Sequence, residues 1–282
     1  MGGVDLLSTG SALTVRRGPV AEQLRLTGVP AGRWIFLSPH LDDAALSCGN
    51  LLLALTGAAE TIVATAFTGS GPASTLSARA FVRQCGAGSA EQLYVARREE
   101  DALALESAGS QWVHGGLPEA LFRRRAPRRG TGLLRRLVPE LGHVYPTYRL
   151  HVASGQVSRR DEATVRAVEE FVERVRSSGP AVLVAPLGIG SHVDHVLVRD
   201  VAAGTGAAVV YYADVPYALR AAPDAAFLRR HHLVRVVVPA GAFPKRDLVE
   251  RYGTQARALF PQGVPDLPDE LYVPSASLVT EP

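Results

Sequence analysis

One pattern occurs twice in this 282-residue chain and limits the folds that it can adopt: a short apolar run, a turn containing His and Asp, and a helix-like segment. The first apolar run is residues 34–37, and its helix-like segment extends over 43–57. The second run is residues 181–187, followed by a helix-like segment over 196–203. Short apolar runs that alternate with helices are typical of buried parallel strands. We therefore predict an α/β, Rossmann-like fold with a mostly parallel sheet and helices on both faces.

The His and Asp residues of both patterns follow a predicted strand directly. Residues 38–44 read Ser-Pro-His-Leu-Asp-Asp-Ala, and residues 191–195 read Ser-His-Val-Asp-His. Ligands of open α/β sheets bind at this carboxyl edge of the strands. Two adjacent carboxylates repel each other unless a cation or hydrogen bonds offset the charge. Two histidines and a carboxylate, with one position left for water, are the ligand set expected of a catalytic zinc site.

A purely structural interpretation of the first motif is also open. Asp42 or Asp43 can cap the following helix while His40 packs in the turn. Capping needs only one of the two acids, so this interpretation leaves the other acid and the histidine unexplained.

The two motifs together resemble the PIG-L/LmbE de-N-acetylases, whose signature is Pro-His-Pro-Asp-Asp-Glu with a later His-x-Asp-His. Residues 97–101 (Arg-Arg-Glu-Glu-Asp) and 117–123 (Leu-Pro-Glu-Ala-Leu-Phe-Arg) extend the resemblance, which covers most of residues 33–260. Leu41 and Ala44 depart from the signature at positions that are not metal ligands in the family. Some members carry a tyrosine where this chain has Gly190, so a tyrosine that assists catalysis would come from elsewhere.

The resemblance implies a metal centre and roles for five residues. His40, Asp43 and His195 would bind Zn²⁺, with Fe²⁺ as an alternative, and water would be the fourth ligand. Asp42 would be the general base that takes a proton from this water. His192, if it is protonated, would stabilise the oxyanion and protonate the departing amine. The substrate would be an N-acetylated amino sugar or its glycoconjugate, from secondary metabolism or a sugar-thiol pathway.

Three further features have a functional and a structural interpretation. Asp194 would orient an imidazole and fix its tautomer, or would only cap a helix. Arg97 would bind substrate, or would form an ion pair with Glu100 on a solvated helix face. Seven arginines within residues 122–137 would attract an acidic substrate, or would form a solvated segment.

Other functions receive less support from the residues. Gly188-Ile-Gly190 suggests a nucleotide-binding Rossmann protein, but Val193 stands where the third glycine would be. A non-catalytic binding protein remains an alternative, although every proposed catalytic position carries a competent residue.

A net charge of +3 and the lack of a basic, aromatic module do not indicate a nucleic-acid partner. The substrate would be a small molecule, and the oligomeric state stays open.

Composition indicates a soluble, cytoplasmic protein. No run of about 18 apolar residues occurs that could span a membrane. Cys48 and Cys85 are too few for a disulfide framework. With 47% hydrophobic residues the chain can form one large domain over 33–282, after an N-terminal arm over 1–32, with an Arg-rich insertion near 122–160.

The remaining segments complete the predicted α/β pattern. Residues 69–88 are expected to form a long Gly-rich loop beside the site, and Asp161 is expected to cap a helix. Further strands are predicted at 12–15, 60–68, 111–113, 207–213 and 233–239, and further helices at 89–108 and, exposed and Arg-rich, at 244–260.

Overall fold

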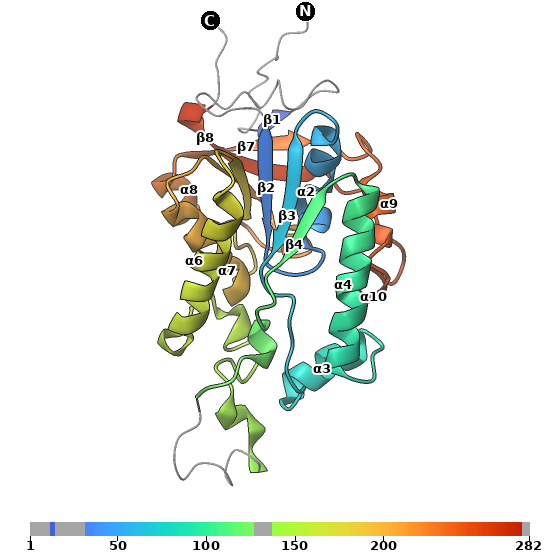
Figure 1. Cartoon of the computed structure of the whole chain (residues 1–282), viewed down its shortest axis with the longest axis vertical. Coiled ribbons are helices and arrows are strands. Elements are labelled where there is room, and N and C mark those ends of the chain that lie inside the picture. The colour runs from blue at the N-terminus through green and yellow to red at the C-terminus, as the bar shows by residue number, and fades with distance from the viewer. Residues whose placement is uncertain (1–11, 15–31, 127–136, 278–282) are drawn as a thin grey trace, which may run out of the picture.

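The computed structural model describes residues 12–14, 32–126 and 137–277, and its described strands form one eight-stranded sheet (Figure 1). The strand order is β1-β7-β8-β6-β5-β2-β3-β4. All neighbours are parallel except at β8, which is antiparallel to both β6 and β7. The predicted α/β fold with a mostly parallel sheet is therefore confirmed. The strands are β1 (Ala12–Thr14), β2 (Arg33–Ser38), β3 (Glu60–Thr65), β4 (Gln111–His114), β5 (Val182–Pro186), β6 (Val209–Tyr212), β7 (Leu233–Val238) and β8 (Asp269–Pro274).

Helices cover both faces of this sheet, as the sequence predicts (Figure 1). One side carries α2 (Asp43–Leu55), α4 (Ala90–Ser107), α9 (Lys245–Glu250) and α10 (Gly253–Leu259). The other side carries α6 (Glu162–Arg176), α7 (Val193–Gly204) and α8 (Ala225–Arg230). Helix α3 (Leu76–Gln84) lies beyond the sheet, near the amino-terminal end of α4 (Figure 1).

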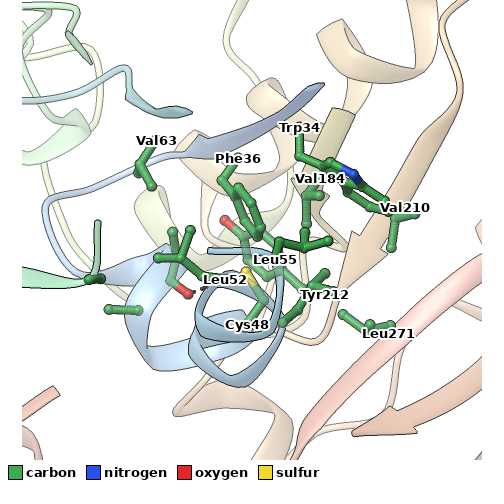
Figure 2. Close-up of a cluster of buried hydrophobic side chains, with 14 of the residues drawn as sticks. Trp34, Phe36, Cys48, Leu52, Leu55, Val63, Val184, Val210, Tyr212 and Leu271 are labelled. Carbon is green, nitrogen blue, oxygen red and sulfur yellow. Dashed lines mark hydrogen bonds between the residues drawn. The ribbon is translucent and has the colours of Figure 1, made fainter. Parts of the chain in front are cut away.

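The apolar side chains of β2 divide between two cores because successive strand residues face opposite sides of the sheet. Trp34 and Phe36 pack with Leu52 and Leu55 of α2 on one side, and Figure 2 shows this cluster. Ile35 and Leu37 pack on the other side, against α6 and α7. Burial of both faces explains why residues 34–37 are continuously apolar rather than alternating.

Three local predictions are wrong, each for a physical reason. Residues 69–88 are not a continuous loop, because they contain α3, whose first turn is capped by Thr75. Residues 244–260 form two helices, α9 and α10, and their buried residues include Leu248 and Tyr252, so this region is not simply exposed. Asp161 stands at the N-cap position of α6 without capping it, since its carboxylate faces Arg123 and Tyr145.

Several smaller predictions can be compared directly with the structure. The strand near residue 12 is present and pairs with β7. Helix α4 has the predicted Ser89 cap, whose hydroxyl accepts the Gln92 N–H at 3.2 Å. Both cysteines are free thiols. No helix in the described part of the chain is long and apolar enough to span a membrane.

The domain assignment stays a prediction. Most of the predicted N-terminal arm, and residues 127–136 of the Arg-rich segment, lie outside the described residues.

Candidate metal centre

The two His/Asp motifs meet because the strands that precede them are neighbours. β2 pairs in parallel with β5, with Phe36 beside Val184. The first motif follows β2 and the second follows β5, so both lie at the same edge of the sheet. The structure therefore brings together His40, Asp43 and His195, as the sequence predicts.

The turn after β2 is held by Ser38 and by Asp43, whose Oδ2 accepts the His40 N–H at 2.8 Å. The Ser38 hydroxyl donates to the His40 carbonyl at 2.7 Å and accepts the Ala44 N–H at 3.1 Å. Asp42 occupies the N-cap position of α2 without a side-chain capping bond, and its φ is 148°. Helix capping therefore does not account for Asp42, and its carboxylate is left for another role.

Three ligand-type atoms form a nearly equilateral triangle. His40 Nδ1 lies 3.1 Å from Asp43 Oδ2, and His195 Nε2 lies 3.3 Å from both of these atoms. A tetrahedral zinc with bonds of about 2.0–2.1 Å places neighbouring ligand atoms about 3.3–3.4 Å apart. These three side chains can therefore hold a divalent metal with little movement.

A carboxylate orients each of the two imidazoles in this triangle. His195 Nδ1 meets Asp214 Oδ1 at 2.6 Å, and His40 Nε2 meets Asp194 Oδ2 at 3.0 Å. An ionised carboxylate only accepts hydrogen bonds, so each histidine turns the lone pair of its other ring nitrogen toward the triangle. Asp214 was missed in the sequence, although it follows β6 directly in the same way as the two motifs follow β2 and β5.

Burial and charge shift the pKa values of the two adjacent acids in opposite directions. Burial raises the pKa of Asp42 to about 7, and the neighbouring Arg97 only partly opposes this shift. Burial also acts to raise the pKa of Asp43, but attraction to His195 and His40 outweighs it and lowers this pKa to about 2. At neutral pH Asp43 is thus an anion, whereas Asp42 is close to its midpoint.

His192 is a third imidazole beside the triangle. Nitrogen atoms of His40, His192 and His195 lie within 4.8 Å of one another, so three imidazoles are an alternative metal-binding group. The Asp43 triangle is tighter and closer to tetrahedral spacing. His192 Nδ1 accepts the Asp194 N–H at 3.2 Å and so caps α7, which leaves Nε2 to carry the proton of the neutral ring. Burial, together with His40 and His195, holds the pKa of His192 well below its ordinary value.

Arg97 is buried at the site and does not pair with Glu100. Its Nη2 lies 3.4 Å from Asp42 Oδ1, and its Nη1 lies 3.5 Å from Glu119 Oε2. Glu100 instead accepts the Thr254 N–H at 3.0 Å. The predicted ion pair on a solvated face is therefore wrong.

A cavity of about 360 Å³ opens over these side chains. Helix α3 supplies Ser77, Ala80, Phe81 and Gln84 to its wall, so part of the segment predicted as a loop does line the site. Tyr148 and Tyr217 also line it, and their hydroxyls lie 2.9 Å apart.

Gly190 explains how Tyr217 reaches this wall. The φ of Gly190 is +83°, and a Cβ built there would lie 2.4 Å from Tyr217 Cγ. Tyrosine side chains thus reach the site from other segments, while position 190 has no room for one.

Comparisons with known proteins agree with this architecture. The family profile described as "PIG-L: GlcNAc-PI de-N-acetylase" matches residues 35–205. The 2'-N-acetylparomamine deacetylase of Streptomyces fradiae is 32% identical over 194 residues, covering 66% of this chain and 58% of that protein. The chain thus matches less than two thirds of the length of this curated relative.

Solved structures share the fold. The zinc-inhibited form of the teicoplanin deacetylase Orf2 superposes with a TM-score of 0.63 at 22% identity, over 85% of this chain and 97% of that one. The A40926 pseudoaglycone deacetylase Dbv21 gives a TM-score of 0.58 at 23% identity, over 88% and 99%. With the match over residues 35–205 and the paired motifs at one sheet edge, the chain belongs to the PIG-L family.

Proposed function

We propose that this protein is a metal-dependent N-deacetylase that releases acetate from an N-acetylated amino sugar or its glycoconjugate. The observation that carries the proposal is the triangle of His40 Nδ1, Asp43 Oδ2 and His195 Nε2 at a cavity that Asp42 also lines. The family description names a de-N-acetylase, and the curated relative is named as a deacetylase. Both support N-deacetylation as the reaction class.

Zn²⁺ is the metal that we propose for this triangle, with Fe²⁺ as the alternative. Two imidazoles and one carboxylate suit both ions, and the 3.1–3.3 Å spacing fits tetrahedral Zn²⁺. When bound, such an ion supplies Lewis-acid activation of water and of an amide carbonyl.

Asp42 is the proposed general base. It lies beside a proposed ligand in sequence but is not part of the triangle, and its raised pKa makes it a better proton acceptor than an exposed aspartate. Arg97, 3.4 Å from Asp42 Oδ1, favours the ionised form that a base requires. We also propose that Arg97, which lines the cavity, binds a substrate oxygen.

His192 is the proposed donor to the reacting amide. Because Nδ1 accepts a backbone N–H, the neutral ring carries its proton on Nε2 and can donate it without being a cation. A neutral donor stabilises a developing oxyanion by a hydrogen bond, whereas protonation of the departing amine requires the imidazolium form of the ring. The low pKa of His192 thus fits the role of neutral oxyanion donor and disfavours the protonated ring that the role of acid requires.

The nucleotide-binding alternative receives no support from the geometry. A bound phosphate would use free N–H groups at the start of α7, but His192 already accepts the Asp194 N–H there. Gly190 is packed against the Tyr217 ring.

The experiment is acetate release measured across N-acetylated amino sugars and their conjugates, after the purified protein is stripped of metal and reloaded. We expect about one metal ion per chain, with acetate release that is lost on chelation and restored by Zn²⁺ or Fe²⁺. Undiminished acetate release from metal-free protein would overturn the metal role. A metal-loaded protein that releases acetate from no member of the panel would overturn the proposed substrate class.

A further inference from the structure

Arg123 is a buried arginine that neither touches the proposed metal triangle nor lines the cavity. It follows the 3₁₀ turn Ala120–Phe122, and only 3% of the residue is exposed. Its guanidinium lies over the rings of Phe67, at 4.6 Å, and Tyr145, at 5.5 Å. Arg123 Nε donates to the Pro118 carbonyl at 3.1 Å. The side chain is therefore fixed in one position.

Two buried aspartates share this guanidinium. Arg123 Nη1 contacts Asp161 Oδ2, and Arg123 Nη2 contacts Asp194 Oδ1. Asp161 also accepts the Tyr145 hydroxyl at 2.9 Å, which explains why it does not cap α6. A buried carboxylate is costly as an anion unless a cation and hydrogen bonds satisfy it. Arginine stays protonated and has a planar fork that can hold two acceptors at once.

The other oxygen of Asp194 points toward the metal triangle. Asp194 is fully buried, and its Oδ2 accepts the Ala120 N–H at 2.9 Å and meets His40 Nε2 at 3.0 Å. The Asp194 carboxylate accepts a hydrogen bond from the Nε2–H of His40. The Nδ1 of His40 is therefore left as the metal-binding nitrogen.

The partner of the second histidine is satisfied differently. Asp214 Oδ2 accepts the Ile189 N–H at 2.7 Å, and Asp214 Oδ1 meets His195 Nδ1; neither of these contacts, within the described residues, involves an arginine. The guanidinium is therefore specific to the His40 side of the triangle.

We propose that Arg123 is a positioning residue of the metal centre: it holds Asp194 as an oriented acceptor, and Asp194 in turn fixes His40 in the tautomer that binds metal through Nδ1. The contacts continue from Asp161 at the start of α6, through Arg123 and Asp194, to His40. This inference rests on the proposed metal site and adds to it a residue that touches neither metal nor substrate.

The test measures metal affinity of stripped full-length protein, by competition with a chromophoric chelator for Zn²⁺. We expect Arg123→Met to weaken Zn²⁺ binding roughly 10- to 100-fold, the range found when partners of metal-binding histidines are removed. Arg124→Met is the matched control, because it removes the neighbouring arginine, which is exposed, and should leave the affinity unchanged. Circular dichroism confirms that each variant is folded.

Further variants separate positioning from general destabilisation. Combining Arg123→Met with Asp194→Asn should weaken binding no more than Asp194→Asn does alone, because both changes break the same path to His40. The absorption spectrum of Co²⁺ at saturation should change in Arg123→Met and stay unchanged in Arg124→Met. If Arg123→Met does not fold, Arg123→Lys and Asp161→Asn test the same path with smaller expected losses.

Two results must be distinguished. Wild-type protein that binds no divalent metal would overturn the proposed metal site itself. Wild-type affinity and an unchanged Co²⁺ spectrum in folded Arg123 variants would overturn only the role of Arg123, as would additive losses in the double variant.

Discussion

Replacing Asp42 by Asn should produce two opposite effects, a slower reaction and a more stable protein. The change keeps the size of the side chain and removes the proposed base. Loss of a general base costs roughly 10²- to 10⁴-fold in rate, or about 3–5 kcal/mol of transition-state stabilisation. His40, Asp43 and His195 are untouched, so the variant should keep its metal.

The stability gain follows from the buried charge. Raising the pKa of Asp42 from 3.8 to about 7 corresponds to about 4 kcal/mol, as an order of magnitude. Because the folded-state pKa is the higher one, the wild type loses this contribution as pH rises from about 4 through 7. Metal-free Asp42→Asn should therefore match the wild type near pH 4 and be more stable by a few kcal/mol at pH 8.

Two assays check the prediction. Urea unfolding of metal-free protein at pH 4 and pH 8 gives the stability difference, and acetate release by metal-loaded protein gives the rate. Near-normal turnover in a fully loaded variant would show that another residue takes the proton. Loss of metal would show that Asp42 is a ligand. Equal stability of the two proteins at pH 8 would refute the raised pKa of Asp42 in the folded protein.

Three other outcomes are expected. Asp43→Ala and His195→Ala should each lose most metal affinity, because each removes one corner of the triangle; stoichiometric Zn²⁺ at low micromolar metal in either variant would contradict the ligand set. His192→Ala should keep its metal and lose at least roughly 10²-fold in turnover, checked by metal analysis and acetate release on one sample, whereas a loss of metal would point to the three-imidazole group instead. Burial lowers the pKa of His143, whose Nε2 lies 3.2 Å from the Ser74 hydroxyl, so the wild type should lose stability relative to His143→Gln as pH falls below about 6.5. Thermal unfolding between pH 5 and 8 checks this, and parallel curves for the two proteins would exclude it.

The sequence predicted the site better than its surroundings because the ligand motifs are local while their supports are not. His40 and Asp43 follow one apolar run and His195 follows another, and parallel strands bring such positions to one edge. The partners that fix them come from distant segments without a motif. Asp214 follows β6, and Arg123 stands within a run of arginines that looks like a solvated segment.

Helix α3 and strand β8 were not predicted from the sequence for a similar reason. Helix α3 is short and lies in a Gly-rich stretch, so its apolar spacing is weak, and it is stabilised by packing of Ala78 and Val82 against a core that includes Leu93 and Phe122. Strand β8 was not predicted, because a Pro-rich stretch precedes it and its pairing with β6 and β7 is set by the rest of the sheet.

The contact between Gly190 and Tyr217 restricts how a chain of this kind can change over evolution. A side chain at position 190 would overlap the Tyr217 ring and would also meet a backbone angle that favours glycine. A side chain introduced at position 190 alone would clash with Tyr217. A smaller residue introduced at position 217 alone would leave an empty space in the wall of the site. The two positions are therefore expected to vary together among relatives, so that a lineage with a tyrosine at 190 carries a smaller residue at 217.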